Sequence, residues 1–401
     1  MDHSAAPEAE GTGGVMRWRR FTVSFAYPLA FTRGLFDPAN PTFAETLALN
    51  GAETPARCAV FADDGLLAAR PGLAQAIAGY AAAHAGAMTL AAPPVPTPGG
   101  EAAKAGLGPL RAILDAIHRL RIDRHSYVVA LGGGAVLDAV GLAAATAHRG
   151  VRLIRVPTTT LAQNDAGVGV KNAVNLNGAK NYMGTFAPPW AVLNDFDMLD
   201  SLPAAARIAG VAEAVKVALI RDRAFFDWLE ASADALRAFE PAVEERMIRV
   251  CADLHLDQIA HGGDPFETGS ARPLDFGHWA AHRLESVTGG AIGHGDAVAI
   301  GVALDTRYSV LSGLAPAGTD DRVAALLRRL GFRLWRPEMA ARDAAGRPAL
   351  LAGVEDFREH LGGRLSVTML RAVGEGVETA AIDASLVAAA LGWLETRDGA
   401  A

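Results

Sequence analysis

Residues 126–138 read Ser-Tyr-Val-Val-Ala-Leu-Gly-Gly-Gly-Ala-Val-Leu-Asp, and this stretch decides the fold. Its first six residues form a run of strand length that is apolar after Ser126, and the three glycines that follow end that run. A helical pattern then continues from Gly134 to about Arg149. The stretch therefore predicts a buried strand, a tight turn and a helix, which together form one unit of a parallel sheet.

The same alternation extends to both sides of this unit. Strands are predicted at residues 59–61, 88–90 and 153–156, and helices at residues 71–84 and 99–120. This order favours a Rossmann-like parallel sheet with helices on its faces. After Leu199 the pattern becomes helical, with helices predicted at residues 204–220, 225–238, 240–261, 276–288, 295–312 and 319–330. We therefore expect a disordered tail over residues 1–14, an α/β domain over 15–200 and an all-α domain over 201–401.

Composition excludes several classes of protein. A chain of 401 residues with 51% hydrophobic and 20% charged residues can bury the cores of two globular domains. The net charge of -7 gives no reason to expect nucleic acid or a membrane as partner. The two cysteines, Cys58 and Cys251, are far apart, which argues against a disulfide framework and favours the cytoplasm. The longest apolar stretch contains Asp138, so we do not expect a membrane span.

Three histidines near residue 280 point to a metal site. His278 and His282 have i,i+4 spacing on a predicted helix, so their imidazoles share one face. His294 follows a glycine-rich break and can fold back toward them. Upstream, Glu213 and Lys216 also share a helical face. One Glu with two His is a common ligand set for a catalytic zinc with an open position, although a His pair also occurs in ordinary cores.

Polar residues follow the strands of the predicted sheet. Thr158 and Thr159 end a strand on the side where open α/β sheets bind ligands. The loop-rich sequence after them carries Asp165, Lys171, Lys180 and Asn181. Lysines suit phosphate and Asp or Asn suits hydroxyls, so this segment favours an oxygen-rich, phosphorylated substrate. The alternatives are that the threonines only fill the end of a strand and that the charged residues form a solvated loop. A glycine turn such as that at 132–134 also occurs in proteins that bind no nucleotide.

Taken together, these motifs resemble those of the 3-dehydroquinate synthase superfamily, the sugar phosphate cyclases. The resemblance runs from about Phe21 to the C-terminal region and is densest in residues 132–138, 157–181, 210–220 and 275–301. The motifs, in chain order, are GGGxxxD, PTT, QxDxxxGxK, GxKN, AExxK, FGHxxxH and HGxAVAIG. The ordered set is far more specific than any of its members.

The resemblance implies an N-terminal NAD-binding α/β domain and a C-terminal helical domain that holds Zn²⁺ or another divalent metal such as Co²⁺. By matching position, the metal ligands would be Glu213, His278 and His294. The NAD contacts would include Asp63, Glu101, Lys104, Gly133, Gly134, Asp138, Thr158 and Thr159. The catalytic residues would be Asp165, Lys171, Lys216 and His282. Lys180 and Asn181 would bind substrate, and Arg149 would reach the phosphate of a neighbouring subunit, which implies a homodimer.

The resemblance also implies a reaction, that of a phosphate-eliminating carbon–oxygen lyase. The family oxidises a secondary alcohol of a ketose phosphate with NAD, which makes an adjacent C–H acidic. Phosphate is then eliminated, the hydride is returned, and an intramolecular aldol step closes a carbocycle. The expected partner is therefore a small-molecule ketose phosphate, and NAD is regenerated in each turnover.

The chain departs from dehydroquinate synthases just before the first of these histidines. Those enzymes carry Arg-x-x-x-Asn-Phe-Gly-His and an upstream Lys, and these cations help to hold the anionic end of a heptulosonate. Counting back from His278 places Asp275 at the Asn, Ala271 at the Arg with Arg272 shifted by one, and Asp257 at the Lys. Carboxylates repel a substrate carboxylate and accept hydrogen bonds from hydroxyls. These residues therefore predict a substrate with a neutral head group.

Two further segments indicate the branch of the superfamily. Residues 356–363, which include His360, resemble the corresponding part of C7-cyclitol synthases such as 2-epi-5-epi-valiolone synthase, so His360 is expected to bind substrate. Those enzymes cyclise sedoheptulose 7-phosphate, which has no carboxylate. Residues 275–282 and 169–171 resemble the EboD-type branch. The alternatives are 3-dehydroquinate synthase, an NAD-dependent polyol or alcohol dehydrogenase, and a catalytically silent binding protein on the same fold.

Overall fold

The computed structural model describes residues 18, 19, 21–49, 51, 55–267, 273–360 and 365–399. Three of the sequence predictions lie outside these ranges: the tail over residues 1–14, Ala271 and Arg272. The side chain of His360 is also outside the description.

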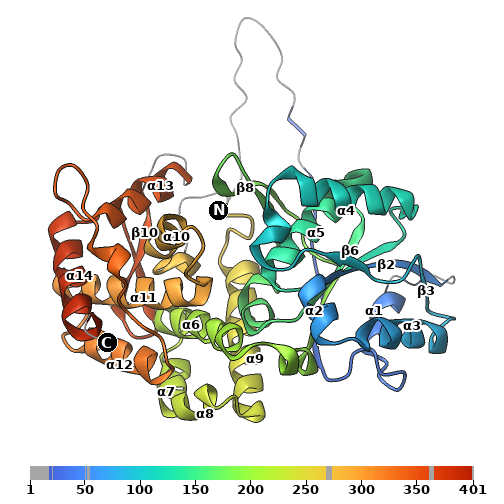
Figure 1. Cartoon of the computed structure of the whole chain (residues 1–401), viewed down its shortest axis with the longest axis horizontal. Helices are drawn as coiled ribbons and strands as arrows, with labels where there is room; N and C mark the ends of the chain where they lie inside the picture. The colour runs from blue at the N-terminus through green and yellow to red at the C-terminus, as the bar shows by residue number, and fades with distance from the viewer. Residues whose placement is uncertain are drawn as a thin grey trace, which may run out of the picture.

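A parallel sheet organises the N-terminal half (Figure 1). Its seven strands within the described residues are β1 (Leu29–Thr32), β2 (Ala56–Asp63), β3 (Met88–Leu90), β4 (Val95–Thr97), β5 (Tyr127–Gly132), β6 (Arg152–Pro157) and β9 (Ala191–Asp195). They run in the order β1-β9-β6-β5-β2-β3, with β4 also paired to β2. All these pairs are parallel. Every residue of β5 is buried, because parallel strands are covered on both faces.

Five helices cover the two faces of this sheet: α1 (Thr42–Ala48), α2 (Asp64–Ala69), α3 (Leu73–Ala83), α4 (Leu107–Arg119) and α5 (Gly134–Thr146). Alternate residues of β5 enter two separate cores, since strand side chains alternate between faces. Val128 packs with α4 and α5, while Val129 packs with α1 and α3. The predicted strand–turn–helix unit and the βαβα order are confirmed.

One predicted helix of this half is divided. Residues 99–120 form a short 3-10 helix, Gly100–Lys104, and then α4. Ala105 leaves the helical path because it forms a parallel β-bridge with Asn175. The break brings the 3-10 helix, which carries Glu101 and Lys104, against the segment that follows β6.

The segment that was expected to be a loop around Lys171 and Lys180 is instead an antiparallel hairpin of β7 (Lys171–Leu176) and β8 (Ala179–Phe186). Asn177 and Gly178 form its two-residue turn with positive φ values of 54° and 79°. An Asn-Gly pair is the sequence signal for such a turn. The hairpin gives its lysines a more fixed placement than a loop would.

The C-terminal half is mainly helical, as predicted. Its helices are α6 (Ala204–Arg221), α7 (Arg223–Ala231), α8 (Ala233–Arg237), α9 (Pro241–His261), α10 (His278–Val287), α11 (His294–Leu311), α12 (Thr319–Arg329), α13 (Ala352–His360) and α14 (Ala384–Asp398). Two details of the sequence prediction were wrong. Residues 225–238 belong to two helices rather than one, and a hairpin of β10 (Val367–Ala372) and β11 (Glu375–Thr379) means that this half is not all-α.

Helices α6 and α9 lie between the sheet and the group of helices α10, α11, α12, α13 and α14 (Figure 1). Gly295 at the start of α11 packs directly on α6, since an added Cβ would lie 2.5 Å from the Cα of Ala209. This close approach brings the start of α11 beside the middle of α6. Among the described residues, no helix has the length and apolar character needed to cross a bilayer.

Candidate active site

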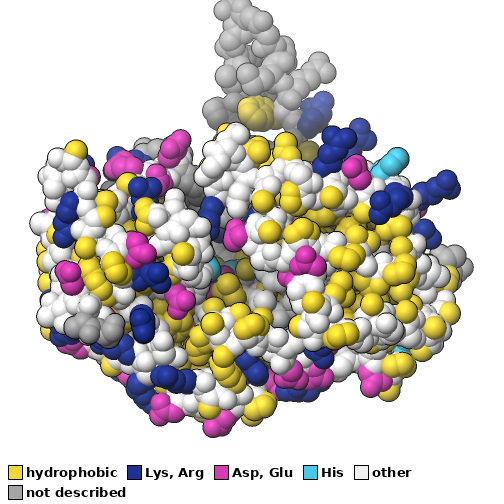
Figure 2. All heavy atoms as spheres, viewed as in Figure 1, with side chains coloured by type: hydrophobic (Ala, Val, Ile, Leu, Met, Phe, Trp, Pro, Cys, Tyr) yellow, Lys and Arg dark blue, Asp and Glu magenta, His cyan; other side chains and the backbone are white. Residues whose placement is uncertain are grey.

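Glu213, His278 and His294 converge at one point. Glu213 is fully buried in α6, and the two histidines are the first residues of α10 and α11. Their candidate ligand atoms all lie within 4.8 Å of one another. Oε1 of Glu213 is 3.5 Å from His278 Nε2 and 3.3 Å from His294 Nε2. In the space-filling view, histidine side chains lie in a hollow between the two halves (Figure 2).

The electrostatics of this triad fit a cation. Both carboxylate oxygens of Glu213 are buried, and the side chains that face them are Lys216 and the two histidines. Burial lowers the pKa of His294, but hydrogen bonds to Glu213 and Glu285 outweigh it and raise that pKa to about 10. The site therefore favours a positive charge between these side chains. A divalent metal meets that demand, and one Glu with two His is a donor set that leaves a position open for substrate.

A contact with a backbone carbonyl group fixes the orientation of the His278 imidazole. Its Nδ1 lies 3.2 Å from the carbonyl oxygen of Phe276. When Nδ1–H donates to that oxygen, Nε2 is left as the ligand atom that faces Glu213. Gly277, at the start of α10, has a φ of 79°, and an added Cβ would lie 2.7 Å from the backbone nitrogen of Val302. Only glycine fits this approach between α10 and α11.

Asp305, which the sequence reasoning did not single out, anchors the same turn. Its side chain is fully buried in α11 and accepts hydrogen bonds from Trp279 Nε1 at 2.9 Å and from the Gly277 backbone N–H at 3.0 Å. Burial raises the pKa of Asp305 from 3.8 to about 7. The carboxyl group thus fixes the residues on both sides of His278.

Asp305→Ala is expected to lower the free energy of unfolding by roughly 2–4 kcal/mol, because each buried donor left unpaired costs about 1–3 kcal/mol. Urea unfolding followed by circular dichroism measures the change, with Glu355→Ala, an exposed carboxylate in α13, as control. A loss no larger than that of the control would contradict the anchoring role.

A second charged group adjoins the triad. Lys216, almost fully buried in α6, places Nζ 2.5 Å from Glu213 Oε2 and 3.9 Å from Asp165 Oδ1. His255 Nδ1 lies 2.8 Å from the same oxygen, Asp165 Oδ1. Burial raises the pKa of Asp165, but Lys216 and His255 outweigh it and lower that pKa to about 2. Burial likewise opposes the charge on Lys216, yet Glu213 and Asp165 raise its pKa above the ordinary value.

The structure places Asp257 away from this group. Its side chain is 68% exposed, and Oδ1 lies 3.3 Å from Nδ1 of His261. His255, two residues earlier on α9, faces Asp165 instead, because residues two apart on a helix point in different directions. Counting back along the sequence therefore chose the wrong face of α9. The usable signal was the i,i+4 spacing of His255 from Cys251, which is buried.

Three other predicted residues surround the triad. His282 lies with its ring centroid 5.4 Å from that of His278, and burial together with the neighbouring histidines lowers its pKa to about 3, so its imidazole is neutral. Asp275 ends the 3-10 helix Pro273–Asp275. Burial raises its pKa, but Lys171 and the histidines outweigh this and keep it below the ordinary value. Lys171 Nζ lies 2.6 Å from Oε1 of Glu267, a partner that sequence reasoning missed.

The predicted cofactor residues gather at the carboxyl ends of the sheet strands. Gly133 precedes α5, and an added Cβ would lie 3.2 Å from Cγ2 of Thr159. The Thr158 backbone N–H donates to the Gly132 carbonyl at 3.0 Å. At the end of β2, Asp63 caps α2 by accepting from the Leu66 backbone N–H. This edge of an open α/β sheet is where ligands bind, and Gly134 begins the helix whose N-terminus favours an anion.

A network joins this edge to the β7–β8 hairpin. Lys104 Nζ lies 2.5 Å from Asp138 Oδ2 and donates to Asn181 Oδ1 at 2.8 Å. Asn175 Nδ2 donates to Glu101 Oε2 at 3.2 Å. Predicted cofactor residues and a predicted substrate residue are therefore in direct contact.

Arg149 does not join these residues within the single chain. It is exposed and follows the C-terminal end of α5, the far end of that helix from the glycine turn. Thirteen helical residues span about 20 Å, so its guanidinium is remote from this chain's own site. Its role toward a neighbouring subunit, and the homodimer itself, stay predictions.

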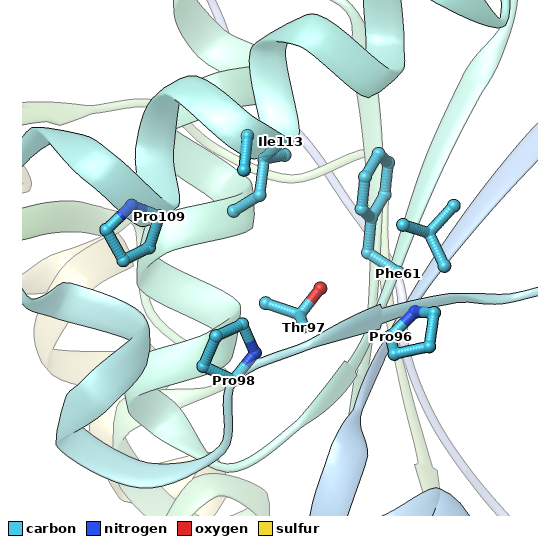
Figure 3. Close-up of a pocket in the computed structure, with 8 residues that line it drawn as sticks. Phe61, Pro96, Thr97, Pro98, Pro109 and Ile113 are labelled. Atoms are coloured by element: carbon cyan, nitrogen blue, oxygen red, sulfur yellow. The ribbon is translucent and has the colours of Figure 1, made fainter.

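A small cavity lies beside β4 and is lined by residues of β2, β4 and α4 (Figure 3). It has a volume of about 60 Å³, and its lining includes Phe61, Pro96, Thr97, Pro98, Pro109 and Ile113. Pockets that hold drug-sized ligands have volumes of about 300–1,000 Å³, so this cavity is too small to hold a nucleotide or a sugar phosphate by itself.

Both halves of the chain match families of known proteins. The family described as "3-dehydroquinate synthase N-terminal" matches residues 94–209, and "3-dehydroquinate synthase C-terminal" matches residues 210–347. The 3-dehydroquinate synthase of Paracoccus denitrificans is 34% identical over 365 residues, which cover 90% of this chain and 94% of the relative. That of Halorhodospira halophila is 40% identical over 268 residues, or 67% of this chain and 73% of the relative. The chain belongs to the 3-dehydroquinate synthase family.

Solved structures of cyclases have the same fold. A 2-epi-5-epi-valiolone synthase from Streptomyces hygroscopicus subsp. jinggangensis, with NAD+ and Zn²⁺ bound, aligns with a TM-score of 0.81 and 27% identity over 95% of this chain and all of that one. A 2-deoxy-scyllo-inosose synthase with carbaglucose-6-phosphate, NAD+ and Co²⁺ aligns with a TM-score of 0.72 and 22% identity over 90% and 95%. The predicted fold is confirmed, and the chain is a sugar phosphate cyclase of the carbon–oxygen lyase class.

Proposed function

We propose that this cyclase depends on NAD and a divalent metal and acts on a ketose phosphate with a neutral head group, sedoheptulose 7-phosphate being the first candidate. The observation that carries the proposal is the place of Asp275, which lies three residues before His278 and whose carboxylate feels the charges of Lys171 and of the neighbouring histidines. Its carboxylate stays ionised, so it accepts hydrogen bonds from hydroxyls and repels another carboxylate. In its finer form, the same proposal assigns the chain to the EboD-type branch of the superfamily.

The residues present fit both bound groups. Glu213, His278 and His294 would hold Zn²⁺ or Co²⁺, and the glycine turn at 132–134 with Thr158 would hold NAD. NAD would supply a reversible hydride acceptor for a secondary alcohol, and the metal would supply a Lewis acid for the alcohol oxygen.

The chain's own side chains supply binding and proton transfer. Lys216 balances the buried carboxylates of Glu213 and Asp165 and keeps its charge, so it can donate a hydrogen bond to a substrate hydroxyl. His282 is neutral and can take or give a proton at one ring nitrogen. Lys171 and Lys180 provide cations for the phosphate that must bind and then leave.

The second candidate is 3-dehydroquinate synthase itself. The relatives that carry this name are 34–40% identical to the chain, which favours the same substrate. The two candidates share the reaction class and differ in whether the substrate carries a carboxylate. Incubation of the purified protein, NAD+ and Zn²⁺ with a panel of ketose phosphates, followed by measurement of released phosphate, separates them.

NADH absorbance is expected not to accumulate while phosphate is released, because a cyclase returns each hydride within the same turnover. Absorbance and phosphate are followed in parallel samples with excess NAD+. A steady rise of NADH that matches the substrate consumed would instead support a polyol or alcohol dehydrogenase.

A further inference from the structure

Glu285 lies between the triad and the β7–β8 hairpin, and the reasoning from sequence did not select it. Its side chain is 6% exposed. Oε1 accepts a hydrogen bond from Lys180 Nζ at 3.0 Å and lies 3.4 Å from His294 Nδ1. Its other oxygen, Oε2, is buried without a hydrogen-bond partner. A buried carboxylate is costly unless it is paired, so these two contacts account for its place in α10.

We propose that Glu285 is a positioning residue that links Lys180 to the metal centre. The proposal rests on the proposed function, in which His294 is a metal ligand and Lys180 binds an anionic group of the substrate. Because Glu285 accepts from Nδ1–H of His294, it selects the tautomer whose Nε2 lone pair is free. That Nε2 lies 3.3 Å from Glu213 Oε1, within the triad. A carboxylate behind a ligand histidine fixes the ring and raises its basicity.

The linkage follows from one shared atom. Lys180 and His294 both face Oε1, and they come from β8 and α11, elements far apart in the sequence. The Lys180 side chain is 38% exposed, so an anion from solvent can reach it. When an anion pairs with Lys180 and moves it away from Glu285, the negative charge of Glu285 acts on His294 alone. Substrate binding at Lys180 therefore strengthens the hold on the metal, and bound metal strengthens anion binding by the same factor.

The experiment measures Zn²⁺ affinity of the full-length protein by competition with a chelator. Glu285→Gln is expected to weaken Zn²⁺ binding by about 10–100-fold, the usual effect of losing the carboxylate behind a ligand histidine. The visible spectrum of the Co²⁺-substituted variant is expected to shift as well. Lys180→Gln should bind Zn²⁺ no more weakly than the unaltered protein, because Glu285 keeps its bond to His294. Glu267→Gln, which removes the carboxylate next to Lys171, is the matched control and should leave affinity unchanged.

Two results would overturn the proposal. One is a Zn²⁺ affinity of Glu285→Gln equal to that of the unaltered protein. The other is a loss of Zn²⁺ affinity in Lys180→Gln as large as that in Glu285→Gln, which would assign the effect to the Lys180–Glu285 ion pair. Circular dichroism of the metal-free variants verifies folding. If Glu285→Gln does not fold, Glu285→Asp, which keeps the charge but shortens the reach, takes its place under the same two criteria. Absence of Zn²⁺ binding in the unaltered protein would contradict the proposed function instead.

Discussion

The purified protein should release phosphate from sedoheptulose 7-phosphate with a kcat/KM at least about 100-fold above that for 3-deoxy-arabino-heptulosonate 7-phosphate. Like charges brought together cost several kcal/mol, and each 1.4 kcal/mol is a factor of about ten. The charge in question is that of Asp275, whose pKa stays below its ordinary value because Lys171 and the neighbouring histidines outweigh the effect of burial. A hydroxyl in the same place would donate to Asp275 at no such cost.

Asp275→Asn tests the cause of this preference. The amide keeps the size of the side chain and removes its charge, so the ratio between the two substrates should narrow, mainly through better binding of the heptulosonate. Asp257→Asn is the matched control, since Asp257 is exposed on α9 and pairs with His261. Equal kcat/KM values on both substrates in the unaltered protein, or an unchanged ratio in Asp275→Asn, would contradict the role of Asp275.

His278→Ala should lose the metal and nearly all phosphate release. The change leaves Glu213 and His294 as ligands, too few for a stable site with an open position. Loss of activity should exceed about 100-fold, since removal of residues behind a ligand alone costs 10–100-fold. Elemental analysis gives the metal content, and phosphate release gives the activity.

His261→Ala serves as the control for this variant, because His261 lies on α9 beside Asp257 and is mostly exposed. It should retain metal and activity. Stoichiometric metal in His278→Ala would remove His278 from the ligand set, and the triad would then need another member.

The sequence predicted those parts of the fold that depend on local pattern. The strand–glycine turn–helix unit at 126–146 was predictable because burial, turn chemistry and helical periodicity agree over a short span. The histidine pair of α10 was predictable from its i,i+4 spacing. The Asn-Gly turn at 177–178 gave an equally local signal for the β7–β8 hairpin, but the charged residues around it favoured a loop.

Long-range contacts were beyond the sequence. Glu285 and Asp305 look like ordinary helix residues until α10 and α11 are packed together, when each contacts the start of the other helix. Asp257 was selected by counting residues back from His278, and such a count does not reveal which face of α9 turns inward, the face on which His255 lies. Counting residues identifies the matching position only where the two sequences have no insertion between them and the helix turns the same face inward.

Under the proposed function, this chain eliminates phosphate from a neutral-headed ketose phosphate while it regenerates its own NAD. The most direct measurement supplies Zn²⁺, excess sedoheptulose 7-phosphate and NAD+ in an amount far below that of the substrate, and counts the phosphate released. The expected result is many equivalents of phosphate for each NAD+, together with a carbocyclic product. Phosphate release that stops after one equivalent for each NAD+ would contradict this function. So would turnover of a heptulosonate phosphate by a protein that releases no phosphate from any neutral-headed ketose phosphate.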